Sequence, residues 1–407
     1  MKRPTDAAML DGILAGVRVV DLTQNVAGPF CTQVLGDLGA DVVKVERPGA
    51  GDDARGWRSA EPDSVSPHFV AANRNKRSIC IDLGRAEGTA LLRRLIGQAD
   101  VFVHALKPAS ARSRGLDYGS LAPEAPRLVY CAISAYGGSG PLGELPGYDP
   151  VMQAYTGLMS LTGGERDGPA RIPVSVIDIG AGLWAALGVL AACLRRERTG
   201  RGGCVQTSLL ETGLAWLGPL IAAYQIDGRT PQRMGTAMGN AAPYELFAAA
   251  DGHVFIATPN DALFARACRA LGCPELAGDP RFAANAGRLE RRAELHGLLE
   301  ARTLRRSVRD NVTALRAEGV PCSEMNDLAQ ALREPQVQAV DMLAPQPLAQ
   351  HPDFRAVSLP LRMDGERSRA MRPAPALGEH TDEVLGPAGL GLSAGEIAAL
   401  RQAGIVA

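Results

Sequence analysis

The sequence lacks the features that would place it at once in several large classes of protein. Its 43 lysines and arginines are balanced by 44 acidic residues, and no basic tract is interleaved with aromatic side chains. Nucleic acid is therefore not expected as a partner. The start of the chain has no apolar core of signal-peptide length, and no run approaches about 18 uncharged apolar residues. These absences predict a soluble cytoplasmic protein that has no membrane partner.

Signatures of metal binding and of disulfide frameworks are also missing. The eight cysteines form no C-x-x-C pair, and no histidine lies near a cysteine or another histidine at the spacing of metal ligands. No metal site is therefore predicted. Cys193 falls in an apolar, helix-like stretch, while Cys80 and Cys131 fall in strand-like stretches. The sequence thus predicts buried free thiols.

The first half of the chain alternates between strand-like and helix-like patterns. Residues 16–23 and 41–46 are typical of strands on either side of a helix over 29–40, which predicts a βαβ unit with parallel strands. Further predicted elements are a helix near 86–99 and strands at 76–83, 100–106 and 127–134. An α/β fold with a Rossmann-like, mainly parallel sheet accounts for residues 1 to about 205.

The remainder of the chain has a different character. After a helical stretch near 206–226, Asp251 and Gly252 separate two strand-like runs within 244–258, which is a strong hairpin signal. Amphipathic helical patterns, the first over 261–272, follow, and the Pro-rich part beyond 340 ends in a short helical pattern. Since 407 residues exceed one ordinary core, we predict a large α/β domain, a smaller α+β domain and a C-terminal segment over 1–225, 226–335 and 336–407.

A dinucleotide site is the first function that such a sheet suggests. Glu46 ends the second predicted strand, where an acid would bind a ribose. The first turn, however, reads TQNVAGPF and contains a single glycine, whereas a pyrophosphate needs the close backbone approach that G-x-G-x-x-G provides. This absence argues against a nicotinamide-dependent dehydrogenase.

One acid stands at the start of the apolar stretch PVSVIDIGAGLWAALGVLAACLRRERTGRGG, residues 173–203. Arginines precede Gly200 at its end, and leucines recur at steps of four and three, which predicts a helix anchored by Leu183, Leu187, Leu190 and Leu194. Asp178, at the start of this helix, is interpreted from its position as a cap that accepts backbone N–H groups.

Five blocks carry a family resemblance: DLTQNVAGPFCTQVLGDLGADVVKVERPGAGDDARGW (21–57), NRNKRSICIDL (73–83), GYDPVMQAYTGLMSLTG (147–163), VIDIGAGLWAALGVLAACLRRERTGRGG (176–203) and ALGEHTDEVL (376–385). Together, and in the right order, they resemble the class III CoA-transferases, the formyl-CoA and carnitine-type (CaiB/BaiF-like) enzymes. The resemblance implies an intertwined homodimer, a C-terminal segment that returns to the large domain, and no cofactor beyond coenzyme A (CoA) as a substrate.

In that family the acid of the block matching VIDIGAG is the nucleophile, so the resemblance assigns this catalytic role to Asp178. Its carboxylate would attack an acyl-CoA thioester and form a mixed anhydride and then an aspartyl-CoA thioester. This chemistry requires a carboxylate that is ionised at neutral pH and partly desolvated, beside donors for an oxyanion. A helix N-terminus favours the ionised form, so cap and nucleophile are compatible interpretations. N–H groups around Gly180 or in the 235–240 loop are expected to hold the oxyanion.

Contacts to CoA carry over from the resemblance one position at a time. Arg47 matches an arginine directed at the nucleotide of CoA, since a guanidinium suits phosphate geometry; an ordinary surface arginine is the alternative. Asn25, Val26 and Ala27 match the turn that lies along the CoA chain, or form a plain loop wall.

A second group of expected CoA contacts lies on the predicted strand at 76–83. Lys76 and Arg77 begin this strand, where they either meet phosphate or solvate a strand edge. Ile81, on the same strand, is a further expected contact.

The segment after the strand at 100–106 departs from the family pattern. Where the family usually has Glu-Asn-Phe-Arg-Pro-Gly, residues 104–109 read His-Ala-Leu-Lys-Pro-Ala. The Asn that contacts CoA is therefore Ala105 here, and the family's later arginine matches Ser113. Cations that compensate for these losses are expected among Lys107, Arg112 and Arg114.

The block GYDPV distinguishes two chemistries within the superfamily. Tyr148 and Asp149 are what the transferases show beside the acyl pocket, whereas the 2-methylacyl-CoA racemases carry His in place of Tyr148 as a base for the α-proton. Read alone, Tyr-Asp-Pro is a good turn. A racemase therefore remains an alternative function, and a non-catalytic CoA-binding member of the family is another.

The stretch RMGTAMGNAAPYELF (233–247), with the blocks above, looks most like the members that move CoA from succinyl-CoA to dicarboxylates such as glutarate. A dicarboxylate needs a cation or several donors for its distal carboxylate. This stretch forms either a mobile lid or an ordinary inter-domain loop. The candidate substrate-binding residues in it are Arg233, Gly235, Gly239 and Asn240.

Overall fold

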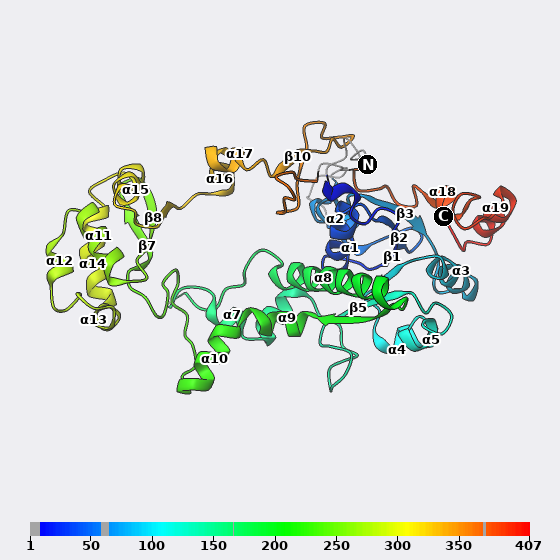
Figure 1. Ribbon diagram of the computed structural model, residues 1–407, viewed down its shortest axis with the longest axis horizontal. Helices are drawn as coiled ribbons and strands as arrows, with labels where there is room; N and C mark the ends of the chain where they lie inside the picture. The colour runs from blue at the N-terminus through cyan, green and yellow to red at the C-terminus, as the bar shows by residue number, and fades with distance from the viewer. Residues whose placement is uncertain (1–8, 58–64, 166, 369–371) are drawn as a thin grey trace. The chain divides into compact units, whose positions relative to one another are not determined.

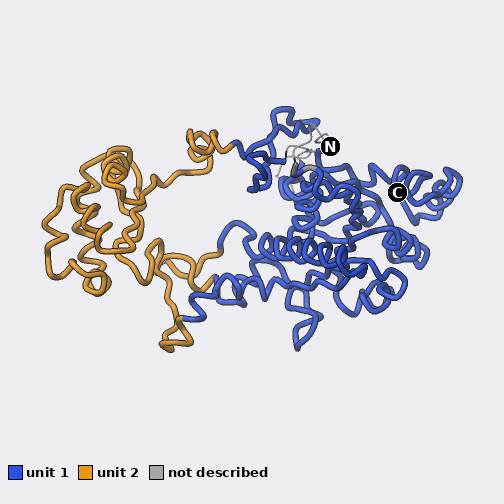
Figure 2. Tube along the Cα trace, viewed as in Figure 1, with its two compact units in different colours: residues 1–158, 172–222, 341–407 blue, residues 159–171, 223–340 orange. Residues whose placement is uncertain are grey.

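The computed structural model describes residues 9–57, 65–165, 167–368 and 372–407 (Figure 1). The chain divides into two compact units (Figure 2). Unit 1 comprises residues 1–158, 172–222 and 341–407, and unit 2 comprises 159–171 and 223–340. The division at 222 falls beside the boundary suggested by the sequence, but no sequence pattern marked 159–171 as part of the second unit.

Unit 1 contains a six-stranded parallel sheet with the order β3-β2-β1-β4-β5-β6. This is the strand order of a doubly wound, Rossmann-like sheet, as predicted. The strands are β1 (Arg18–Leu22), β2 (Asp41–Glu46), β3 (Lys76–Cys80), β4 (Val101–His104), β5 (Val129–Ser134) and β6 (Gly203–Ser208). The first five are confirmed, whereas β6 was missed because its sequence, GCVQTS, has only one β-branched apolar residue and was assigned to a helical stretch.

Helices cover both faces of the sheet, because strand residues alternate in direction. On one face, Val19 and Val42 pack with α1 (Ala27–Asp37) and α8 (Val176–Thr199). On the other, Val20 and Val43 pack with α3 (Ala86–Gly97). The C-terminal α18 (Thr381–Leu385) and α19 (Ala394–Gln402) lie against this second face too, and a β-bridge joins Ile81 to Val406 (Figure 1).

The packing of α8 overturns most of the predicted leucine anchor, since of its four leucines only Leu190 is partly buried against the core. Leu183, Leu187 and Leu194 are 48%, 55% and 58% exposed. The buried face instead carries small residues, Ala181, Ala185, Ala186, Val189 and Ala192. Small residues are needed there because α1 approaches closely: a Cβ on Gly182 would lie 2.4 Å from the Ala27 carbonyl oxygen. Length and composition alone would let α8 cross a bilayer, but half of its most apolar stretch is buried in the protein.

Unit 2 has an antiparallel sheet of β7 (Tyr244–Ala249), β8 (Gly252–Ala257) and β9 (Cys322–Glu324). The predicted hairpin is confirmed, although Ala250 and Asp251 form the connection and Gly252 already pairs with Ala249. Phe247, Phe264 and Phe282 are buried in its core. Packed on this core are α11 (Asp261–Ala270), α14 (Arg292–Thr303) and α15 (Val308–Ala317).

All eight cysteines are free thiols. Cys80 and Cys131 are buried, as predicted, and burial raises the pKa of both. Cys193 is only half-buried, and Cys204 on β6 is exposed. The prediction of buried thiols is therefore confirmed for Cys80 and Cys131, holds only in part for Cys193 and fails for Cys204.

The α1–α8 contact can be tested with two glycine substitutions. We expect Gly182→Ala to lower the free energy of unfolding by about 1–3 kcal/mol, because its Cβ meets backbone that cannot move aside. The matched control is Gly97→Ala on α3, where a Cβ meets nothing within 4 Å and stability is unchanged or raised by up to about 1 kcal/mol. Urea unfolding measures both, and equal stabilisation by the two would contradict the close approach.

Candidate active site

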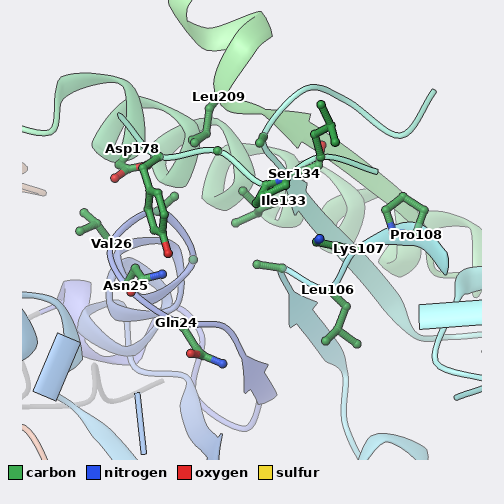
Figure 3. Close-up of a pocket in the computed structure, with 18 of the residues that line it drawn as sticks. Gln24, Asn25, Val26, Leu106, Lys107, Pro108, Ile133, Ser134, Asp178 and Leu209 are labelled. Carbon is green, nitrogen blue, oxygen red and sulfur yellow. The ribbon is translucent and has the colours of Figure 1, made fainter. Parts of the chain in front are cut away.

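A cavity of about 210 Å³ opens at the carboxyl ends of β1 and β4 (Figure 3). The strand order reverses between these two strands, which is where doubly wound folds bind ligands. Asn25, Val26 and Ala27 line it from the turn after β1, and Lys107 lines it from the segment after β4. Asp178 and Val26 lie on one side of the cavity and Lys107 on the other (Figure 3). The resemblance therefore selected residues that the fold brings together.

Asp178 is the third residue of α8 and is 9% exposed. It does not cap the helix, which corrects the first interpretation. The N-cap position belongs to Ser175, whose side chain also makes no capping hydrogen bond. Asp178 instead presents its carboxyl group to the cavity.

Asp149 supplies the missing cap from another helix. It begins α6 (Asp149–Tyr155), and its Oδ2 accepts the N–H groups of Ile177 at 2.7 Å and Asp178 at 3.2 Å. Its Oδ1 accepts Gln153 Nε2 at 2.5 Å. Asp149 is 1% exposed and does not line the cavity. Its predicted contact with substrate is therefore wrong, whereas Tyr148 does line the cavity.

The surroundings of the Asp178 carboxyl group raise its pKa. Burial, and then the charge of Asp149, raise its pKa from 3.8 to about 7. This direction departs from the expectation of a carboxylate that is ionised at neutral pH, because burial disfavours the charge and the first-turn amides that were to favour it are bound to Asp149.

The oxyanion donors expected around Gly180 are not available. Val176 N–H donates to Val174, Ile179 N–H donates to Ser175, and the two amides between them donate to Asp149. Gly180 packs against α9 (Leu209–Trp216), where a Cβ would lie 2.6 Å from the Trp216 ring. Its role is therefore close packing.

Free amides line the cavity at the start of α1 instead. Within the part of the chain that the structure describes, the N–H groups of Ala27 and Gly28 have no hydrogen-bond acceptor, and no side chain caps α1. Gly28 tolerates no side chain, since a Cβ would lie 2.3 Å from Thr23 Cβ. Because unpaired N–H groups at the start of a helix stabilise negative charge, these two amides mark the part of the cavity where a negatively charged group would be stabilised.

A second cavity of about 390 Å³ adjoins the first and shares Gln24, Asn25, Ala105 and Leu106 with it. Of the expected CoA contacts, Arg47, Ile81 and Arg114 line this second cavity. Arg47 Nε donates to Gly51 O at 2.9 Å, and its Nη2 pairs with Asp53. Arg114 Nη1 donates to Ser110 Oγ at 2.6 Å.

Lys76 and Arg77 lie away from both cavities, which corrects their assignment to CoA. Lys76 is fully buried, and its Nζ donates to Asp21 Oδ2 at 3.0 Å, Pro29 O at 2.9 Å and Asn73 Oδ1 at 2.8 Å.

Arg77 forms ion pairs with Asp41 and Glu383. It stands opposite Val43 in the sheet, near the amino ends of the strands, whereas the cavities lie at the carboxyl ends. The sequence pattern marked two cations but not the direction of their side chains.

Glu46 is not free to bind a ribose. It accepts Arg55 through both carboxylate oxygens, each at 2.7 Å, and Ser78 Oγ at 2.6 Å. The Asp52 N–H also donates to it, at 3.0 Å. These bonds give a second, physical reason against a dinucleotide site, in addition to the missing glycines.

The segment that departs from the family pattern forms the wall between the two cavities. His104 is buried, which lowers its pKa to about 4; its Nδ1 accepts Leu106 N–H at 3.0 Å and its Nε2 contacts Tyr130 Oη at 2.5 Å. Arg112 pairs with Glu144 and lines a different cavity. Of the three cations expected to compensate, Lys107 and Arg114 face the two adjoining cavities.

The remaining predicted substrate residues lie in unit 2, so their roles stay predictions. Gly235 has φ +61° and donates its N–H to Gly163 O, and Arg233 Nη1 donates to Ser160 O. The loop that includes Gly239 and Asn240 is tied by its carbonyls to helical side chains.

Three side chains of α13 (Asn285–Glu290) and α14 make these ties. Asn285 Nδ2 donates to Asn240 O at 3.0 Å, Arg292 Nη2 to Ala241 O at 2.9 Å, and Arg288 Nε to Ala242 O at 2.6 Å. They hold this part of the loop on unit 2. No group of three His, Cys, Asp or Glu residues suited to a metal ion occurs among the described residues.

Known proteins match nearly the whole chain. Residues 14–381 match CoA-transferase family III. The chain is 38% identical over 379 residues to a succinate–glutarate CoA-transferase from Agrobacterium fabrum, covering 91% of this chain and 94% of that protein. It is 35% identical over 375 residues to succinyl-CoA:glutarate CoA-transferase from Homo sapiens, covering 91% and 85%. A crystal structure of a CaiB/BaiF family protein from Brucella suis superposes with a TM-score of 0.80 at 38% identity, covering 91% and 98%.

The reassignment of Lys76 predicts a loss of stability on its substitution. Removing one partner of a buried ion pair leaves an uncompensated charge, so we expect Lys76→Met to cost about 3–5 kcal/mol in urea unfolding. Lys107→Met, which removes an exposed amine without a described ion pair, should stay within about 0.5 kcal/mol of the parent protein. Equal stability of the two variants would contradict the buried pair.

Proposed function

Because the chain belongs to CoA-transferase family III, we propose that it moves CoA from succinyl-CoA to a dicarboxylic acid such as glutarate. The observation that carries this proposal is Asp178: a secluded carboxyl group without a hydrogen-bond donor of its own among the described contacts, facing a cavity that adjoins an arginine-lined one. The named relatives support this choice of donor and acceptor.

In the proposed reaction the Asp178 carboxylate attacks the thioester carbonyl of succinyl-CoA. The C–S bond breaks, CoA leaves as a thiolate, and a mixed anhydride of Asp178 and succinate remains. The thiolate then attacks the aspartyl carbonyl, which releases succinate and leaves an aspartyl-CoA thioester. The acceptor carboxylate attacks this thioester, and the same two steps in reverse order give the new acyl-CoA and free Asp178.

Each tetrahedral intermediate carries an oxyanion that needs donors. The amides of Ala27 and Gly28 support this role, because they are free, they line the cavity with Asp178 and they stand at the positive end of α1. Arg47 and Arg114 support binding of the CoA phosphates in the second cavity. Ile81 and Asn25 line the same cavity and would contact the neutral parts of CoA.

The racemase alternative is less well supported. Moving an α-proton requires a base on one face of the substrate and an acid on the other, and the position at which the racemases carry His holds Tyr148, a phenol that is a poor general base. The non-catalytic alternative would not account for a secluded carboxyl group whose pKa is raised to about 7.

We further propose that the protein is a cytoplasmic homodimer. An exposed apolar face supports the dimer: it consists of Leu183, Trp184, Leu187 and Leu194 on α8 with Leu214 and Trp216 on α9. Its two tryptophan rings lie 5.9 Å apart. A contiguous apolar face on a chain that must stay dissolved is typical of a subunit interface.

The nucleophile is tested by Asp178→Ala. With succinyl-CoA and glutarate, we expect the wild-type protein to form glutaryl-CoA and the variant to lose at least about 10³-fold in kcat, since no other group forms the covalent intermediate. Mass spectrometry should find a CoA adduct on the peptide that holds Asp178 in the wild type alone. A variant as fast as wild type, or α-proton exchange without any acceptor acid, would overturn the proposal.

The dimer is tested by Leu187→Glu, which puts a charge on the apolar face. We expect size-exclusion chromatography with light scattering to give a dimer for the wild type and a monomer for the variant, because burying an unpaired carboxylate is costly. Leu304→Glu, at a leucine in unit 2 that is 48% exposed against 55% for Leu187, is the control and should remain dimeric. A wild-type monomer would contradict the proposal.

A further inference from the structure

Asp149 is an unusual residue to bury beside a nucleophilic carboxyl group. It lies 29 residues before Asp178 in the chain, and both of its oxygens are used within the protein. Oδ2 holds two amides in the first turn of α8, one of them that of Asp178 itself. Oδ1 is held by Gln153, which belongs to the same helix, α6. The acid is therefore fixed at one place relative to the nucleophile.

Gln153 in turn ties this pair to the chain segment that leads into α8. Its Nε2 donates to Ile172 O at 3.1 Å, and its Oε1 accepts Ile172 N–H at 2.8 Å. The side-chain amide thus makes two bonds to one backbone residue and a third to Asp149. It is fully buried, so none of these bonds competes with water.

We propose that Asp149 is the positioning residue of the nucleophile: it fixes the first turn of α8 through the backbone and sets a second negative charge against the Asp178 carboxyl group. Asp149 does not touch substrate and acts only through Asp178. The inference rests on the proposed CoA-transferase function and names the residue that prepares its nucleophile.

Asp149 is the acid whose charge acts on Asp178. Of the other elements packed there, α1 contributes Ala27 and Gly28, and α9 contributes Thr212 and Trp216, none of which titrates. Tyr148 and Lys107 are the other ionisable groups on the cavity wall, and Lys107 lies on the side away from Asp178 (Figure 3).

The arrangement makes chemical sense for a carboxylate nucleophile. A helix N-terminus stabilises negative charge and would make Asp178 a weak base and a poor attacking group. Asp149 accepts the hydrogen bonds of the two first-turn amides that would otherwise stabilise the charge of Asp178. Burial, and then the charge of Asp149, raise the pKa of Asp178 from 3.8 to about 7, and a more basic carboxylate is a better nucleophile once it has lost its proton.

The pH dependence follows with a definite sign. Because the pKa of Asp178 is raised, its reactive ionised form is lost as the pH falls through about 7. The rate constant kcat/KM should then fall about tenfold per pH unit below that value. Free dicarboxylic acids lose their charge only near the ordinary carboxyl pKa of about 4, so they do not account for a fall near 7.

The decisive variant is Asp149→Asn, which keeps an oxygen for the two amides and removes the charge. We expect the acid limb of the kcat/KM profile, measured with succinyl-CoA and glutarate from pH 5 to 9, to move at least one unit toward lower pH. For a shift of one unit from a pKa of about 7, the ratio of activity at pH 6 to that at pH 8 should rise about fivefold. Gln153→Met removes the clamp but keeps the charge, so it should lower the Tm without moving the limb.

The matched control is Asp327→Asn, which alters an aspartate that caps α16 (Leu328–Arg333) by accepting Gln330 N–H. It should leave the limb in place. An unmoved limb in a folded Asp149→Asn protein overturns the inference. If that variant does not fold, the pH dependence of CoA-adduct formation by the wild-type protein is the deciding measurement. An acid limb near pH 4 in that dependence also overturns the inference. Absence of CoA transfer by the wild type at every pH would instead refute the proposed function.

Discussion

The contact between α1 and α8 determines the geometry of the active site. Gly182 lets the backbone of α8 meet the Ala27 carbonyl, and alanines of α8 continue the packing against α1. This approach brings the free amides at the start of α1 and the Asp178 carboxyl group to the walls of one small cavity. A larger side chain at Gly182 would push against Ala27 and so displace the proposed oxyanion donors relative to Asp178, the proposed nucleophile.

Beneath the same cavity lies a network of buried charges that shapes the turn after β1. Asp21 accepts Lys76 Nζ, Thr23 Oγ1 and Thr32 Oγ1, and the lysines and hydroxyls hold its pKa at about 2 against the effect of burial. Lys44 donates to Thr23 O at 2.9 Å and pairs with Asp52.

Asp52 completes this network by accepting the Asn25 N–H at 3.0 Å. Asn25, which has φ +68°, is thereby fixed in a backbone conformation that few residues adopt. Lys76, expected at the CoA phosphates, thus serves the site indirectly: it neutralises Asp21, which accepts the N–H and hydroxyl of Thr23 at the start of the turn along which CoA is proposed to lie.

Much of this architecture could be predicted from the sequence, and the failures have local physical reasons. Buried parallel strands are continuous apolar runs, so β1 to β5 were visible, whereas β6 carries polar residues. In α8 both faces are apolar, and periodicity finds the leucines without telling which face meets α1. The five blocks named Asp178, Asn25 and Arg47, but no sequence signal connects Asp149 to amides 28 and 29 residues away.

The cap and the nucleophile, compatible in the sequence, are separated in the structure for a chemical reason. A carboxylate that accepts backbone N–H groups has its lone pairs committed and its basicity lowered, which are the two properties that attack on a thioester requires it to keep. Assigning the cap to Asp149 leaves Asp178 at a helix start without that loss. Asp149 then caps the helix and Asp178 stays available for the proposed attack, two roles that a single residue at the N-cap would be unable to combine.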